Sequence, residues 1–255
     1  VRSLRGRARP RSFFCPNPTI MTLKPIALAA FAALVATHSQ AVTVVQWNFD
    51  SLPTPVTADD LKASETFNGE QSPVLSTVGA ITLARAGGQS GGATDFGLNT
   101  LSYATQGTGD LTRGLRMMVD TSGFDSLMVS WDQRNSGSAS AWTQLQYTVD
   151  GGANWTAAAN FQMASTTFSA RVFDLSEIEG AANNAQFGLQ WLAVFAPGTG
   201  SYAGTTSNYG TGGTIRYDNL TLSGTEIPAV PEPQALLLML AGLGAMGLRL
   251  RRRNA

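Results

Sequence analysis

The side chains that most often carry out catalysis or hold transition metals are missing from the long central part of this chain. The only histidine, His38, and the only cysteine, Cys15, both precede residue 42. A segment without these residues cannot form a Ser-His-Asp triad, a Cys-His dyad, a His-ligated zinc or iron site, or a disulfide. The chemistry available to residues 42–227 is that of carboxylates, amides, hydroxyls and aromatic rings.

Paired carboxylates are the catalytic device that this segment retains. A glycoside hydrolase needs two carboxyl groups roughly 5 to 10 Å apart, and the candidates are Asp132, Asp174, Glu177 and Glu179. No spacing singles out a pair, and the two glutamates lie in a segment with the composition of a solvated turn. We therefore expect no enzymatic activity, with a carboxylate-dependent hydrolase as the alternative.

The charge of the same segment argues against one class of partner. Residues 42–227 contain seven basic and 16 acidic side chains, a net charge of −9. Nucleic-acid binding needs a basic surface, so we expect no nucleic acid as partner. The surplus of carboxylates suits divalent cations better.

Aromatic side chains are the candidates for binding a sugar ring, because sugar rings stack on exposed aromatic rings. Trp142, Tyr202 and Tyr209 lie outside the clearest core positions. The two tyrosines belong to residues 197–213, a segment with six glycines and few apolar residues. Such a loop can carry a binding surface, and the same composition also suits a plain connection. We predict these three rings as ligand-binding residues, with polysaccharide as the ligand.

The elements that must position these residues are short strands. Residues 42–227 are rich in Gly, Ser and Thr and contain one lysine, which argues against a helical protein. Residues 120–123 have a turn composition, and we expect the strands on either side of them to form a hairpin. Eight to ten short strands without a long helix favour an all-β fold, an antiparallel, jelly-roll-like β-sandwich. The clearest strands are predicted at 42–49, 115–119, 127–131, 142–149, 168–175, 187–195 and 214–223.

The string T-V-D-G-G-A-N-W at 148–155 follows one of these strands. It resembles a single Asp-box, the turn motif that repeats in sialidases and other β-proteins. The resemblance implies a tight turn at Asp150, with Trp155 packed beneath it as a folding device. In the preceding strand, alternation places Trp142, Gln144, Gln146 and Thr148 on one face.

Two further strings, W-N-F-D at 47–50 and I-R-Y-D-N-L-T-L at 215–222, look like the first and last strands of jelly-roll carbohydrate-binding and discoidin-like modules. In those modules the two strands usually pair, and a structural Ca²⁺ is often held where they meet. The resemblance implies a calcium site at Asp50, Asp218 and Asn219, since calcium prefers oxygen ligands. The alternative is that both acids cap strand ends and face water.

The front of the chain predicts export. Residues 21–41 have a positive flank, an apolar core and small residues before position 42, the pattern of a signal peptide. Residues 1–20 contain five arginines and no acid. They are interpreted either as the product of a start codon assigned too early or as an extended basic signal flank.

The last part of the chain has three segments in a fixed order. Residues 228–234 are a Pro-rich linker that contains Pro231-Glu232-Pro233, residues 235–248 are apolar, and residues 249–255 are basic. A helix over the apolar residues is about 21 Å long, short of the ~30 Å bilayer core, so it predicts a marginal transmembrane helix. The basic residues Arg249, Arg251, Arg252 and Arg253 place the chain end in the cytoplasm.

This tripartite tail closely resembles the PEP-CTERM sorting signal of Gram-negative bacteria that make extracellular polysaccharide. The resemblance implies the Sec machinery and an exosortase-type processing protease as partners. It also implies transient inner-membrane anchoring, followed by residence at the cell surface or in the extracellular matrix. Combined with the sandwich, it predicts a surface protein that binds polysaccharide or another envelope component; a purely structural matrix component is the other non-catalytic alternative.

Overall fold

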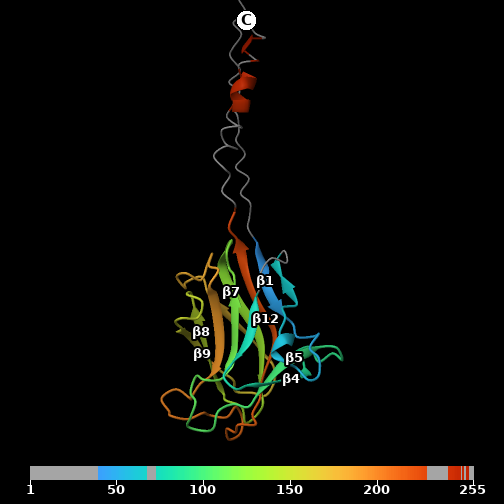
Figure 1. Cartoon of the computed structure of the whole chain (residues 1–255), viewed down its shortest axis with the longest axis vertical. Helices are drawn as coiled ribbons and strands as arrows, with labels where there is room; N and C mark the ends of the chain where they lie inside the picture. The colour runs from blue at the N-terminus through green and yellow to red at the C-terminus, as the bar shows by residue number, and fades with distance from the viewer. Residues whose placement is uncertain (1–39, 68–72, 229–240, 248, 250, 253–255) are drawn as a thin grey trace, which may run out of the picture. The chain divides into compact units, whose positions relative to one another are not determined.

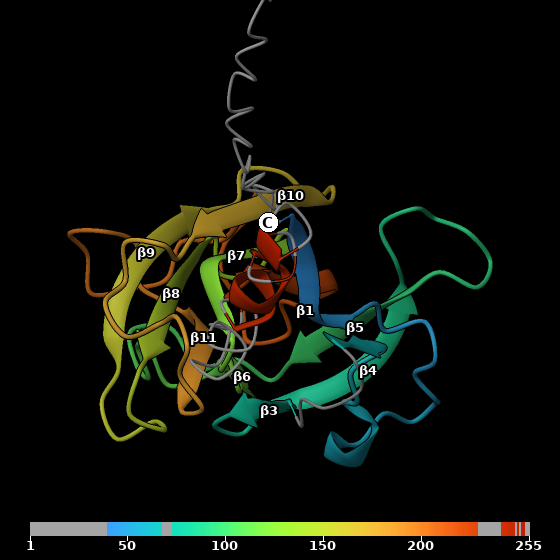
Figure 2. The same cartoon turned by 90° about the horizontal axis from the view of Figure 1, so that it is seen from above.

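The computed structural model describes residues 40–67, 73–228, 241–247, 249 and 251–252. Residues 41–226 form a sandwich of two antiparallel sheets (Figures 1 and 2), which confirms the predicted all-β fold. A 3₁₀ turn, η1 (Ala58–Asp60), lies between the first two strands. The seven-stranded sheet contains β1 (Ala41–Trp47), β2 (Glu65–Thr66), β4 (Thr82–Gly87), β5 (Phe96–Leu101), β7 (Phe124–Asn135), β10 (Ser169–Asp174) and β12 (Ile215–Glu226). The five-stranded sheet contains β3 (Val74–Val78), β6 (Gly114–Val119), β8 (Trp142–Thr148), β9 (Thr156–Gln162) and β11 (Phe187–Ala193), in the order β3-β6-β11-β8-β9.

The last strand, β12, is the centre of the seven-stranded sheet. On one side it pairs with β7 along most of its length; on the other it pairs first with β5 through 215–217 and then with β1 through 220–225. The change of neighbour falls at Asn219, whose φ of 48° is in the left-handed region that Asn tolerates. The predicted pairing of the first and last strands is confirmed. The left-handed residue Asn219 directly follows Asp218.

Aromatic side chains fill the space between the sheets. Trp47, Trp131 and Trp191 are fully buried. The ring of Trp131 packs edge-on against Trp191 at a centroid distance of 5.6 Å and against Phe161 at 5.1 Å. Large buried rings dominate core energetics, so these contacts anchor the two layers to each other.

A buried polar chain also joins the layers. The Gln133 side-chain amide of β7 donates to Asn135 Oδ1 and, across the sandwich, to Thr143 Oγ1 of β8. Asn135 in turn donates to the carbonyl of Ser140, and all four residues are fully buried. Because each buried amide is paired, these polar groups fix the alignment of β7 with β8 without leaving an unsatisfied group.

Two features of the fold differ from the sequence prediction. Strands β6 and β7 do not form a hairpin, because β6 pairs with β3 and β11 while β7 pairs with β10 and β12. The turn at 120–123 therefore crosses from one sheet to the other. The strands β2, β3, β4, β5 and β9 were not predicted; β9 reads T-A-A-A-N-F-Q, in which alanine hides the strand pattern.

Of the predicted apolar tail helix at 235–248, residues 241–247 are helical and the others lie outside the described residues. Within the described part of the chain, no helix has the length and apolar character needed to cross a membrane. Residues 1–20 and all but the last two residues of the predicted signal peptide also lie outside the described residues.

Candidate functional site

Two of the three aromatic residues predicted to bind a ligand, Tyr202 and Tyr209, pack inside the protein against each other. Tyr202 is only 3% exposed, so the expectation that it lies outside the core is wrong. Its ring stacks on Tyr209 at a centroid distance of 4.5 Å and packs edge-on against Phe195. Their hydroxyls donate to the backbone carbonyls of Gly109 and Ala104 respectively. The pair holds a loop in place, and Tyr202 has no face free for a sugar.

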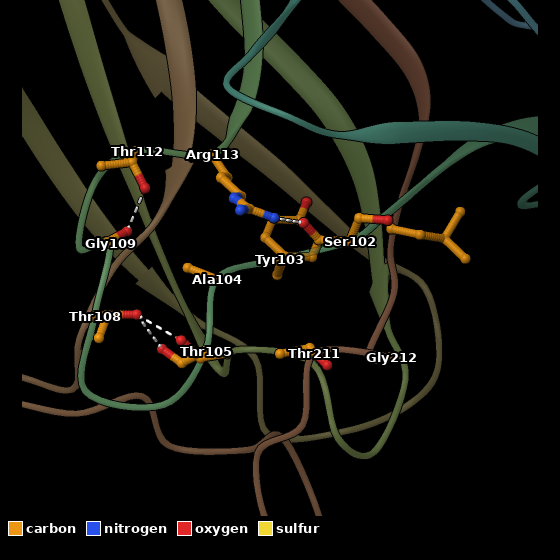
Figure 3. A pocket seen from close by; sticks show the side chains of 11 residues that line it. Ser102, Tyr103, Ala104, Thr105, Thr108, Gly109, Thr112, Arg113, Thr211 and Gly212 are labelled. Atoms are coloured by element: carbon orange, nitrogen blue, oxygen red, sulfur yellow. Dashed lines mark hydrogen bonds between the residues drawn. The ribbon is translucent and has the colours of Figure 1, made fainter.

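The loop that they hold forms a hollow of about 580 Å³ (Figure 3). Residues 101–105, 108, 109, 112 and 113 line it from the β5–β6 connection, and Thr211 and Gly212 line it from the glycine-rich loop. Of residues 197–213, these two line the hollow, and neither Tyr202 nor Tyr209 is among its lining residues.

The chemistry of this hollow is that of hydroxyls and backbone. Thr105 and Thr108 bond to each other at 2.7 Å, and Thr112 donates to Gly109. The Arg113 guanidinium donates from Nη1 to the carbonyls of Ala80 and Ser102, the second of which is drawn in Figure 3. With no carboxylate in the lining, the hollow lacks the general acid that glycoside hydrolysis needs.

Close backbone approach explains two glycines of the glycine-rich loop. The loop is fastened to residues 136–141 by backbone hydrogen bonds, among them the N–H of Ala141 to the carbonyl of Ala203 at 2.8 Å. A Cβ on Gly204 would lie 2.0 Å from a backbone oxygen, and one on Gly213 would lie 2.4 Å from a backbone nitrogen. Only glycine fits at both positions, so part of the glycine content serves packing.

A second polar surface crosses the outer face of the five-stranded sheet. Arg116 of β6 donates twice to Gln190 Oε1 of β11, at 3.3 and 3.1 Å, and Gln190 donates to Gln146 Oε1 at 2.6 Å. The series continues from Gln146 to Gln144 on β8 and from Gln144 to Asn160 on β9. We call Arg116, Gln190, Gln146, Gln144 and Asn160 the amide row.

The amide row leaves hydrogen-bonding capacity at its centre. Gln144 and Gln146 each use one N–H and one carbonyl lone pair within the row. A side-chain amide has two N–H donors and two carbonyl lone pairs. Gln144 and Gln146 therefore each retain one N–H and one lone pair for a ligand. Alternation in β8 predicted that Gln144 and Gln146 share the face of Trp142. The role of Gln190 was missed because it lies in the otherwise apolar strand β11.

Two partly buried tryptophans lie on either side of this row. Trp142 begins β8 and alternates outward with Gln144, while Thr143 points into the core. Trp155 immediately precedes β9, and the guanidinium carbon of Arg116 lies 4.8 Å from its ring centroid. Of the three predicted rings, Trp142 is thus the one placed on an outer sheet face beside polar groups.

The predicted Asp-box turn is present between β8 and β9. Asp150 Oδ1 accepts the backbone N–H of Asn154 at 2.9 Å, Oδ2 accepts the Asn154 side-chain amide at 2.7 Å, and Thr148 donates its hydroxyl. These bonds lower the Asp150 pKa to about 2. Trp155 lies against Gly152, yet it is only partly buried and outside the core cluster. The turn holds Trp155 at the surface, beneath Arg116.

The first and last strands bring two of the predicted calcium ligands into one region. Asp218 is fully buried, and its carboxylate accepts the backbone N–H groups of Gln89 at 2.7 Å and Asn219 at 2.8 Å. Burial, followed by the negative charges of Asp95 and Asp50, raises the Asp218 pKa to about 6. Asp50 is exposed and accepts the N–H of Phe96.

These carboxylates do not form a preassembled cage. Among the described residues, no group of three or more His, Cys, Asp and Glu side chains is arranged to hold a metal ion. The Asn219 side-chain amide donates to Asp132 Oδ2 at 3.0 Å and is therefore engaged elsewhere. A calcium ion here would have Asp50 and Asp218 as carboxylate donors, and most of its other ligands would be backbone carbonyls or water.

The carboxylates considered for hydrolysis are not gathered around a hollow. Asp132 of β7 lies opposite Ala170 of β10, and Asp174 lies four residues further along β10. Four strand residues span roughly 13 Å, which exceeds the separation that the two carboxyl groups of a glycosidase need. Glu177 and Glu179 are exposed in the turns that follow β10.

The sorting residues Pro231, Glu232, Pro233 and Arg253 lie outside the described residues. Comparison with protein-family models identifies a PEP-CTERM protein-sorting motif at residues 229–253. The chain therefore carries the sorting signal that its tail resembles. No curated protein matches the chain.

Solved structures similar to the sandwich include carbohydrate-binding modules. The CBM22-1 xylan-binding domain of Paenibacillus barcinonensis Xyn10C is 11% identical over 75% of this chain and 99% of that domain, with a TM-score of 0.41. A CBM22-1–GH10 structure of Clostridium thermocellum xylanase 10B, complexed with xylohexaose, is 13% identical over 61% of this chain, with a TM-score of 0.41. The matched region spans 27% of the length of that xylanase structure.

Proposed function

We propose that this chain is an exported surface protein whose β-sandwich binds polysaccharide without cleaving it. The proposed binding surface is the outer face of the five-stranded sheet. The observation that carries the proposal is the amide row with Trp142 and Trp155 on its two sides.

This surface has the two kinds of contact that a sugar polymer needs. Tryptophan rings stack on the apolar faces of sugar rings, and the free N–H and carbonyl groups of Gln144 and Gln146 match sugar hydroxyls. Residues 142–148 of β8 span about 20 Å, so the surface extends beyond a single sugar. Because the nearby groups are amides and a guanidinium without a carboxylate pair, the surface supports binding rather than hydrolysis.

Binding to a panel of soluble neutral polysaccharides, measured by calorimetry on the exported protein, tests this proposal. Trp142→Ala should weaken binding roughly tenfold or more, since the stacking of a sugar ring on the tryptophan is lost. Phe96→Ala is the control: it removes a partly buried aromatic ring from the other sheet, where Arg85 lies 4.2 Å from the ring centroid. Equal binding by Trp142→Ala and the wild type would contradict the proposed surface. Sugar products would favour the hydrolase alternative, and absence of binding to every polymer would favour a structural matrix component.

The proposed route to the surface uses the Sec machinery and an exosortase-type protease, with the tail helix as a transient membrane anchor. The PEP-CTERM motif supports the processing step. We expect the exported form to begin near Val42 and, in a host with an exosortase, to lack the residues after about Pro233. Intact-mass measurement checks both ends. A mature species that keeps Arg249 to Arg253 in such a host would instead indicate a plain anchor.

We also propose a structural calcium ion at Asp50 and Asp218. The support is the buried Asp218 carboxylate, which lies close enough to Asp95 and Asp50 for their charges to raise its pKa. A ligand at about 100 times its Kd stabilises the folded state by about 2.7 kcal/mol. Calcium should therefore raise the melting temperature of metal-stripped protein, and Asp218→Ala should abolish the increase. Identical melting curves with calcium and with chelator would rule the ion out.

A further inference from the structure

An arginine pair on the outer face of the seven-stranded sheet has no role in the polysaccharide surface proposed above. Arg134 of β7 and Arg216 of β12 lie directly opposite each other in the antiparallel register. Like charges at directly opposed positions destabilise a sheet. Among the described residues no ion pair joins either guanidinium to a carboxylate. The two cations are therefore side by side without a counter-charge.

Two carboxylates of the same two strands are already engaged in hydrogen bonds. Asp132 and Asp218 form the next outward-facing pair along the same two strands. Asp218 accepts two backbone N–H groups, and Asp132 accepts the Asn219 side-chain amide. Neither acid neutralises the arginines, so the local charge at the arginine pair stays positive in a domain that is acidic as a whole.

Each guanidinium is held in place through one backbone hydrogen bond. Arg134 Nε donates to the carbonyl of Thr166 at 2.6 Å, and Arg216 Nη1 donates to the carbonyl of Gly87 at 2.7 Å. Arg216 Nε is buried and has no hydrogen-bond partner. A guanidinium has five N–H donors, so the pair keeps several oriented donors unused. Burial and then the charge of Arg134 lower the Arg216 pKa.

These donors border a hollow of about 480 Å³, a volume within the range of small-molecule clefts. Its lining contains no acid. Gly87 has open space where a Cβ would stand, whereas a Cβ on Gly88 would lie 2.6 Å from the Asp95 carboxylate. Phe168 supplies an aromatic ring to the lining. The complete lining is Gly87, Gly88, Gln89, Arg134, Thr166, Thr167, Phe168 and Arg216.

We propose that this hollow binds a uronate unit of an acidic polysaccharide. Arginine forks match the two oxygens of a carboxylate, which would relieve the repulsion between Arg134 and Arg216. Phe168 and the Thr166 and Thr167 segment border the space where the sugar ring would lie. The site is separate from the amide row, because the two lie on the outer faces of different sheets.

Calorimetric titration of the exported protein with de-esterified polygalacturonate tests the site. Its methyl-esterified form is the matched polymer, since it has the same sugar backbone without the charge. We expect the de-esterified polymer to bind at least about tenfold more tightly, with the difference shrinking at high salt. Equal binding of the two polymers would overturn the proposal, and so would equal binding of dextran sulfate, which would show a response to charge alone.

Variants locate the binding. Arg134→Gln and Arg216→Gln should each weaken polygalacturonate binding about tenfold, and Arg216→Lys should recover only part of the loss because lysine lacks the fork. Arg85→Gln removes the same charge elsewhere and should bind as the wild type does. Melting temperatures establish that each variant is folded. If Arg134→Gln binds normally while Trp142→Ala does not, the uronate site is wrong and the polysaccharide surface on the other sheet stands.

Discussion

The outer faces of the two sheets differ in how their polar side chains are paired. On the five-stranded sheet, neighbouring side chains complement one another, as donors and acceptors alternate from Arg116 to Asn160. On the seven-stranded sheet, the register places arginine opposite arginine and aspartate opposite aspartate. The side chains of the first face are bonded to one another, whereas the arginines of the second are bonded only to backbone carbonyls.

The contrast between the two faces indicates which side chains keep their geometry without a ligand and which are stabilised by one. A self-paired row keeps its geometry without a ligand, which suits recognition of a neutral polymer by preformed groups. Like-charged pairs store repulsion that an ion of opposite charge can release. A uronate at the arginines and calcium near Asp218 would have this effect.

The largest loss of folding stability should come from a substitution at the centre of the amide row. Gln190 is 4% exposed and bonds to both Arg116 and Gln146. Gln190→Ala leaves both partners short of a hydrogen bond and should lower the free energy of unfolding by about 2 kcal/mol. Urea denaturation measures this. Gln162→Ala, an exposed position at the end of β9, is the control and should change stability by less than about 0.5 kcal/mol.

A smaller difference in folding stability should distinguish substitutions of the arginines on the two faces. Arg116→Gln loses the hydrogen bonds to Gln190 and the contact with Trp155, and should cost about 1 kcal/mol. Arg134→Gln should cost less than about 0.5 kcal/mol, because relief of repulsion with Arg216 offsets the lost bond to Thr166. Unfolding of both variants at low and high salt checks the order. Equal costs would mean that the arginine pair is not repulsive.

The smallest effect concerns the turn that supports the five-stranded sheet. Asp150 has a pKa of about 2 in the folded protein, below its ordinary value of 3.8. A lowered folded-state pKa means that its contribution to stability is present above about pH 4 and is lost as the pH falls toward 2. Asp150→Asn keeps an acceptor without the titration, so it should unfold with a shallower pH dependence in this window. Parallel acid-denaturation curves for the two proteins would contradict this role.

The sequence predicted the sandwich because local patterns determine strands. Alternation in β8 identified its outward face, although Thr148 turned out to be buried and Val149 36% exposed beyond the strand end. The strings at 47–50 and 215–222 predicted the pairing of β1 with β12. The turn string at 148–155 predicted the tight turn at Asp150 but not the surface position of Trp155.

The candidate sites were harder to predict because they depend on register between distant strands. Nothing local shows that Arg134 will face Arg216, or that Gln190 will join Arg116 to Gln146. Tyr202 was misjudged because a glycine-rich segment suggested exposure, while the backbone bonds of that loop carry the ring into the core. The hairpin predicted around residues 120–123 was wrong because a turn composition does not show which sheet the next strand joins.

The position of β12 also governs when the sandwich can be completed. β1 and β12 are bonded across a separation of 175 residues, from Gln46 to Thr221. Until β12 joins the sheet, β1, β5 and β7 each have an edge that lacks its partner strand. Open strand edges are prone to pair with other chains. The domain is therefore most prone to associate with other chains in the interval before β12 is in place.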